Sequence, residues 1–143
     1  MDLNNMRSVM NKRISLCIAC CLFYIFNSYS QNSNPVDTIL LNMLNDSAKY
    51  FSQVGNYDAS YDYSQKVLSI SKGINSGKLD STTNYVVSRN IANAFNSIGI
   101  VYEVRGDYSE ALKNYTAGLK IRIKLNIRKN IASSYSNISN VYY

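Results

Sequence analysis

The chain reads Asn90-Ile91-Ala92-Asn93-Ala94-Phe95-Asn96-Ser97-Ile98-Gly99-Ile100-Val101-Tyr102, and it reads much the same way forty residues later. This segment aligns without gaps on residues 130–142, and six of the thirteen aligned positions are identical. A weaker echo lies upstream, where Gly55-Asn56-Tyr57-Asp58 matches Gly106-Asp107-Tyr108-Ser109 at a spacing of 51. Self-similarity at a period of about 20 to 50 residues indicates an array of stacked structural units. We therefore expect residues 37–143 to form a repeat domain.

Each unit shows the periodicity of helices. Apolar and small residues recur every three or four positions from Ala94 to Tyr102 and again from Tyr108 to Leu119. Gly106 separates the two runs, and Asp107 is placed to cap the second helix. The sequence therefore predicts antiparallel helical hairpins, each with an apolar face that a neighbouring hairpin covers. The predicted helices are 37–54, 57–72, 82–104, 107–124 and 128–143, the first capped by Asp37 or Thr38.

The hairpin that begins near residue 92 resembles the tetratricopeptide repeat. The residues that match the family's motif are Phe95, Ile98, Gly99, Tyr102, Gly106, Tyr108, Ala111, Tyr115 and Gly118. Weaker matches give units at 41–72 and 132–143, the last of them incomplete, and the period is similar to that of extended variants in bacterial sensor proteins. The resemblance implies an all-α fold, a short right-handed solenoid of about two and a half repeats. We expect the tyrosines Tyr57, Tyr102, Tyr108 and Tyr115 to pack between helices, and Gly99 and Ala111 to lie where helices pack closely.

In this family the first helices of the units line a concave groove that binds protein or peptide. The groove positions map onto Asn42, Asn45, Lys49, Gln53, Asn93, Asn96, Ile100, Glu103, Ser133, Ser136 and Asn140. Asparagine amides both donate and accept, so a row of them suits an extended peptide backbone. The alternative is that asparagine is common in this chain and these side chains are merely solvated. Lys49 is the one cation among these positions, so the basic clamp that some relatives use for a terminal carboxylate is not expected.

The composition argues against catalysis. The chain has no His, and its three Cys all lie between residues 17 and 21. Asp58 and Asp62 lie one helical turn apart, but no other group completes a site. We expect no enzyme, no catalytic residue, no metal and no cofactor. The net charge of +6 is too small to indicate nucleic acid binding. The five cations Lys120, Arg122, Lys124, Arg128 and Lys129 suit a helix C-terminus, and the alternative is a specific anionic partner at this cluster.

The N-terminus carries the pattern of a secretory signal peptide. A basic start is followed by an apolar run over residues 14–26 and by small residues before Gln31. We expect residues 1–30 to be cleaved, 31–36 to be a linker, and the protein to be exported to the periplasm or the medium. The alternative is an uncleaved anchor at 14–26, although the run is shorter than a bilayer span requires. A lipoprotein site at Cys20 is disfavoured because an apolar stretch follows it.

The third unit ends within its first helix, at Tyr143. A solenoid cut at this point exposes an apolar face, so we expect a longer protein or self-association through the incomplete repeat. The favoured function is the sensory, ligand-binding N-terminal part of a bacterial signalling protein. The alternative is a stand-alone secreted adaptor or assembly protein.

Overall fold

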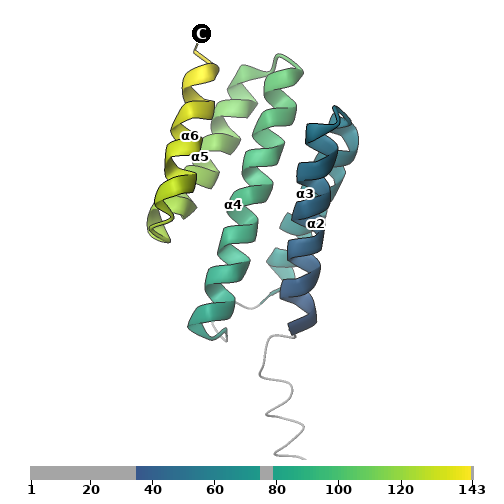
Figure 1. The fold of residues 1–143 in the computed structure, drawn as a ribbon, viewed down its shortest axis with the longest axis vertical. Coiled ribbons are helices and arrows are strands. Elements are labelled where there is room, and N and C mark those ends of the chain that lie inside the picture. The colour runs from purple at the N-terminus through teal and green to yellow at the C-terminus, as the bar shows by residue number, and fades with distance from the viewer. Residues whose placement is uncertain (1–34, 75–78, 143) are drawn as a thin grey trace, which may run out of the picture. The chain divides into compact units, whose positions relative to one another are not determined.

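The computed structural model describes residues 35–74 and 79–142, and every element in these two ranges is an α-helix. The residues in these two ranges belong to one compact unit (Figure 1). The helices are α2 (Pro35–Gln53), α3 (Tyr57–Gly73), α4 (Ser81–Val104), α5 (Tyr108–Lys124) and α6 (Arg128–Asn140). The predicted all-α class is confirmed. The predicted signal peptide lies outside the described residues.

Helices α3, α4 and α5 begin where the sequence supplies capping side chains. Asn56 accepts a hydrogen bond from the Ala59 amide, Asp107 from the Glu110 amide, and Asp80 from the Thr82 and Thr83 amides. The hydroxyl of Thr83 and the two amides lower the pKa of the Asp80 carboxyl, since they favour its charged form. These caps satisfy amides that have no partner inside the helix. Five helices start within two residues of the predicted positions.

The first helix differs slightly from the prediction. It begins at Pro35, ahead of the predicted caps Asp37 and Thr38. Proline is favoured in the first turn because its fixed φ suits a helix. Amides of the first turn have no acceptor within the helix, so the missing amide hydrogen of proline costs no hydrogen bond. The two residues predicted as caps therefore lie inside the helix.

One turn geometry joins helices at three places. Gly55, Gly106 and Asn126 all have positive φ, at 79°, 79° and 54°. In each turn the next amide bonds the carbonyl five residues back: Asn56 to Phe51, Asp107 to Tyr102, and Ile127 to Arg122, at 2.9 to 3.0 Å. This is the left-handed helix terminus that glycine favours and asparagine tolerates. The same turn therefore recurs three times along the described residues.

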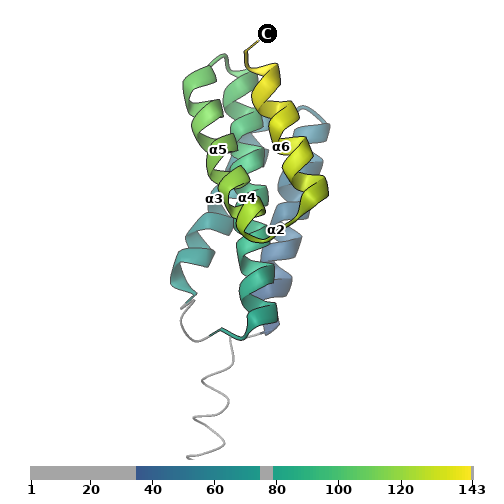
Figure 2. The ribbon, with the colours of Figure 1, turned by 90° about the vertical axis from the view of Figure 1, so that its left-hand side faces the viewer.

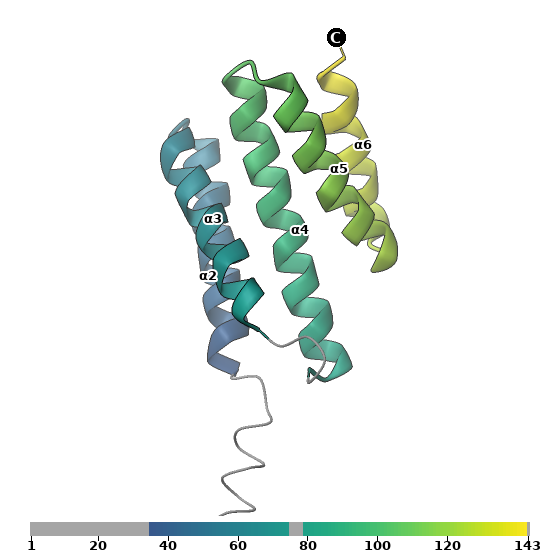
Figure 3. The ribbon, with the colours of Figure 1, turned by 180° about the vertical axis from the view of Figure 1, so that it is seen from behind.

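The helices form two layers. α2, α4 and α6 lie on one face, and α3 and α5 lie behind them (Figures 1 and 3). α2 packs on α3 and α4 on α5 as hairpins, while α3 and α2 both contact α4, and α6 contacts α5. Figure 2 shows α6 lying along α5 at the C-terminal end. None of the described helices combines the length and the apolar character that a membrane span requires.

The core joins neighbouring hairpins. Leu41, Val67, Val87 and Ala94 form a buried cluster between α2, α3 and α4. Between α4 and α5, Ile98, Ala111 and Tyr115 are almost fully buried, together with Gly99 and Gly118. Burial of these apolar side chains is the main contribution to stability. The core therefore runs continuously from one pair of helices to the next.

One motif tyrosine departs from the predicted packing. Tyr108 is 54% exposed, although we expected its ring to pack between helices. It is the first residue of α5, at the outer end of the hairpin, where its ring has neighbours on fewer sides. Tyr135 and Tyr142 belong to the apolar face of the third unit that we expected to be exposed, and they are 55% and 74% exposed.

Candidate functional site

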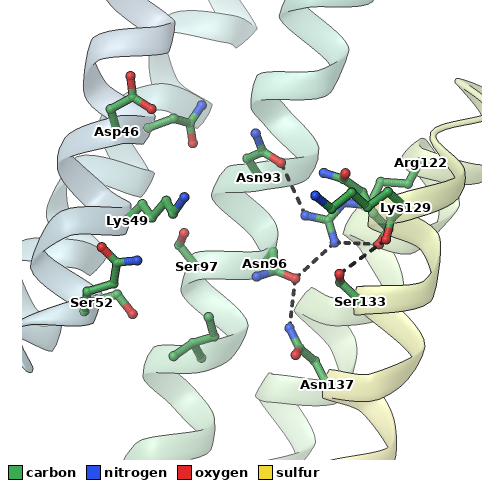
Figure 4. A pocket seen from close by; sticks show the side chains of 14 residues that line it. Asp46, Lys49, Ser52, Asn93, Asn96, Ser97, Arg122, Lys129, Ser133 and Asn137 are labelled. Atoms are coloured by element: carbon green, nitrogen blue, oxygen red, sulfur yellow. Dashed lines mark hydrogen bonds between the residues drawn. The ribbon is translucent and has the colours of Figure 1, made fainter.

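A polar hollow of about 440 Å³ opens on the layer formed by α2, α4 and α6 (Figure 4). Amide and hydroxyl side chains dominate its walls. The residues that line it are Asn45, Asp46, Lys49, Ser52, Gln53, Asn93, Asn96, Ser97, Ile100, Arg122, Lys129, Asn130, Ser133 and Asn137. Three separate helices of one layer, with Arg122 from α5, thus supply a single concave surface.

Seven of the eleven predicted groove residues line this hollow. They are Asn45, Lys49, Gln53, Asn93, Asn96, Ile100 and Ser133. Of the other four, Asn42 lines an adjoining hollow of about 560 Å³. Ser136 and Asn140 are exposed on α6 and line neither hollow. Most of the groove residues predicted from the sequence therefore do lie together on one surface. The prediction extends too far toward the C-terminus, because it includes Ser136 and Asn140.

Glu103 has a structural partner instead of a place in the hollow. The Tyr115 hydroxyl donates a hydrogen bond of 2.5 Å to its carboxylate. Burial, followed by this bond, raises the pKa of the Tyr115 hydroxyl well above its ordinary value. Glu103 therefore joins the end of α4 to α5 and is not available as a groove residue.

Asn42 and Asn45 also serve the fold. The Asn45 amide donates to Asn90 Oδ1 at 2.6 Å and to the Asn90 carbonyl at 3.1 Å. Asn90 in turn donates to Asn42 Oδ1 and to the Val86 carbonyl, both at 2.9 Å. Asn45 is 7% exposed and Asn90 is 1% exposed, so these bonds are shielded from water. The two residues fasten α2 to α4 through Asn45 Nδ2 and Asn42 Oδ1, whereas Asn45 Oδ1 is buried with no hydrogen-bond partner.

Arg122 is the residue of the hollow that the sequence analysis misplaced. We placed it among the cations at a helix C-terminus, and it does lie in the last turn of α5, but it is buried there, with 5% exposed. Its Nη1 donates to Asn96 Oδ1 at 3.1 Å, to Ser134 Oγ at 2.6 Å and to the Asn130 carbonyl at 3.3 Å. Its Nη2 donates to Asn93 Oδ1 at 3.3 Å. One guanidinium therefore connects α4, α5 and α6, and its burial lowers its pKa.

The spacing of residues along α5 could have predicted that Arg122 is buried. It lies seven residues after Tyr115 and four after Gly118, on the face of α5 that is buried against α4. A charged residue at a core position of a helix is uncommon and indicates a special role. Arg122 was not among the predicted groove residues because the family's groove is formed by first helices only, whereas Arg122 lies on the second helix of its hairpin.

The hollow also holds more positive charge than the mapping predicted. Lys49 is joined there by Arg122 and by Lys129 from α6, and Asp46 is the one acidic residue among those that line it. The other lining residues absent from the prediction are Ser52, Ser97, Asn130 and Asn137. The view that a single cation faces this surface is therefore wrong.

The carboxylate pair considered from the sequence lies on the surface of α3. Asp58 and Asp62 are both exposed, and Asp58 pairs with Arg105 at 2.5 Å. The Asp58 side chain is 89% exposed, so this is a surface ion pair of small energetic weight. No group of three His, Cys, Asp or Glu side chains within 35–74 and 79–142 is placed to hold a metal ion.

Comparison with known proteins gives no relative. No family model matches the chain, and no curated protein or solved structure matches it. What can be inferred about its function therefore rests on the geometry of the fold and of the hollow.

Proposed function

We propose that this chain is a scaffold of tetratricopeptide type that binds a protein segment in extended conformation along the α2–α4–α6 face. Its ligand is a peptide or protein, and binding requires no metal, cofactor or nucleic acid. The observation that carries the proposal is the polar hollow, to which three helices of one layer contribute side chains. The two-layer order of the helices and the turn that recurs three times support the repeat architecture.

Free amide donors in the hollow support a backbone-binding role. Asn93 and Asn96 each use Oδ1 to accept a bond from Arg122, and Asn96 also accepts one from Asn137 at 3.0 Å. Within the described residues, the Nδ2 groups of Asn93 and Asn96 make no hydrogen bond. Held in orientation through their oxygens, these amino groups are preorganised to donate to carbonyl groups of an extended chain.

Selection from a library of extended peptides tests this function. The full chain is the bait, and peptides recovered from it are measured by isothermal titration calorimetry. Ser97→Trp fills the hollow with an indole, so we expect it to weaken binding by roughly tenfold or more, through steric exclusion. Ser69→Trp is the matched control, since Ser69 is exposed on α3 and does not line the hollow. Failure to select any peptide, or equal affinity of both variants, would refute the proposal.

The cellular setting follows as a second part of the proposal. We propose export through a signal peptide at 1–30 and a role as the sensory part of a bacterial signalling protein. A stand-alone secreted or periplasmic adaptor is the alternative, with membrane anchoring by residues 14–26 as the alternative to cleavage. Mass spectrometry of the secreted or periplasmic protein tests export, because cleavage gives a chain that starts at Gln31. The sequence of the complete gene separates the sensor from the adaptor.

A further inference from the structure

Arg122 is a buried cation without a counter-charge. Its four hydrogen-bond acceptors are neutral oxygens, from Asn93, Asn96, Asn130 and Ser134. Within the described residues no carboxylate lies at ion-pair distance from it, and its Nε has no hydrogen-bond partner. Buried charges in proteins are nearly always paired, because desolvation of a lone charge is costly. The protein therefore keeps a positive charge here at a cost in stability.

A purely structural role does not account for that charge. The oxygens that Arg122 contacts need hydrogen-bond donors, and a neutral amide also supplies donors without the desolvation cost of a cation. What a guanidinium adds is charge and a rigid planar set of donors, which suits carboxylate and phosphate groups. The choice of residue therefore points toward a ligand as well as toward the fold.

The surroundings extend the positive charge toward the opening of the hollow. Figure 4 shows the Arg122 guanidinium directed from α5 toward Asn93 and Asn96 on α4. Lys49 and Lys129 are exposed on two other walls, from α2 and α6. The free Nδ2 groups of Asn93 and Asn96 are neutral donors between them. Charged donors around neutral donors, in a concave site, form a typical setting for an oxyanion.

We propose that this hollow is an oxyanion-binding site centred on Arg122. The site receives a carboxylate or phosphate group of the ligand. The proposal deepens the scaffold function and rests on it, since it names the chemistry of one group on the bound partner. Lys49 and Lys129 attract the anion and contact it at the opening. Arg122 holds Asn93 and Asn96 in place, and its positive charge lies behind them and attracts the anion electrostatically.

Titration with small anions tests the site without a peptide. Sodium phosphate and sodium acetate are added separately to the ¹⁵N-labelled full chain, with sodium chloride adjusted to keep the ionic strength constant. We expect saturable shifts in the side-chain amide signals of Asn93 and Asn96 and in the Nε–H signal of Arg122. Arg122→Met should weaken binding by roughly tenfold or more, since it removes the charge.

A second variant keeps the test decisive if Arg122→Met fails to fold. The double substitution Lys49→Gln, Lys129→Gln changes exposed side chains, so the core stays intact, and we expect binding roughly tenfold weaker. Lys120→Gln is the matched control, because Lys120 is exposed on α5 and does not line the hollow. It removes one positive charge, where the double variant removes two, and it should leave the affinity unchanged.

Each outcome of the titration has a clear meaning. Saturation by acetate alone identifies a carboxylate as the ligand group, saturation by phosphate alone identifies a phosphate, and saturation by both supports the site without choosing. Shifts that do not saturate, or equal affinities in the double variant and in Lys120→Gln, overturn the proposal. If peptides bind and small anions do not, this inference fails and the scaffold stands; the reverse result leaves the anion site without the scaffold.

Discussion

The ring of Tyr115 lies against the backbone of Gly99, so that α4 and α5 approach closely at this point. A Cβ atom added to Gly99 would lie 2.5 Å from both Cδ1 and Cε1 of that ring. Tyr115 is 1% exposed and is among the largest fully buried side chains. Its hydroxyl is also bonded to Glu103, which restricts the ring further. The absence of a side chain on α4 is therefore what admits the aromatic side chain of α5.

Gly99→Ala should destabilise the protein. The overlap costs about 1 to 3 kcal/mol, because the buried ring has no room to move. The better helix propensity of alanine offsets up to about 1 kcal/mol of this loss. Urea denaturation followed by circular dichroism measures the free energy of unfolding. Gly73→Ala is the control, since nothing lies within 4 Å of its added Cβ. Equal midpoints for the two variants would show that the contact carries no strain.

Gly118→Ala should destabilise the same pair of helices by a different contact. Its Cβ would lie 2.9 Å from the carbonyl oxygen of Ala92, which is backbone and cannot rotate away as a side chain can. A double-mutant cycle separates the two cases. Tyr115→Leu should partly relieve the loss caused by Gly99→Ala and leave that caused by Gly118→Ala unchanged. The same coupling energy in both cycles would contradict the assignment of the two contacts.

The sequence predicts the helices well because their determinants are local. Asn56 and Asp107 cap helices from within the same turn, and Gly55 and Gly106 supply the left-handed residue that ends the helix before them. These signals lie within a few residues of the feature they predict. Asn126 plays the same part as the two glycines, and it was missed because asparagine is frequent throughout the chain.

The function of individual polar residues is harder to predict, because it depends on partners distant in the sequence. Asn45 and Asn90 are 45 residues apart, and Arg122 reaches Asn93 across 29 residues. Whether an asparagine binds a ligand or another helix is decided by these tertiary contacts. The gathering of these residues at one hollow could thus be predicted, whereas the contacts that each makes within the fold could not.

Tyr115→Phe should weaken the fold at neutral pH and change its response to alkali. Loss of the bond to Glu103 costs about 0.5 to 1.5 kcal/mol. Burial raises the pKa of Tyr115, so the unfolded chain loses this proton first, near pH 10. The stability contributed by the neutral hydroxyl is complete below about pH 10 and is lost as the pH rises further.

Denaturation midpoints measured from about pH 8 to about pH 11 check this expectation, the upper limit lying one unit above the ordinary tyrosine pKa. Tyr115→Phe should lose less stability than the parent chain over the alkaline part of this range. Tyr108→Phe is the control at neutral pH, where its 54% exposed ring should make the substitution nearly neutral. Parallel curves for Tyr115→Phe and the parent would contradict the role of the buried hydroxyl.

Asn90→Asp tests whether the bonds between α2 and α4 are needed as they stand. Asn90 donates to Asn42 Oδ1 and accepts from Asn45, so a carboxylate keeps the acceptor but sets a negative oxygen against that of Asn42. Burial and this repulsion raise the pKa of the new carboxyl, and its neutral form is preferred in the fold. We therefore expect stability to fall as the pH rises above about 4, the ordinary pKa of aspartate. Asn84→Asp, on the exposed part of the same helix, is the control and should show no such loss. If the two variants respond alike to pH, the Asn90 amide is not a required donor, and Asn42 Oδ1 depends on its bond from Arg89 at 3.1 Å.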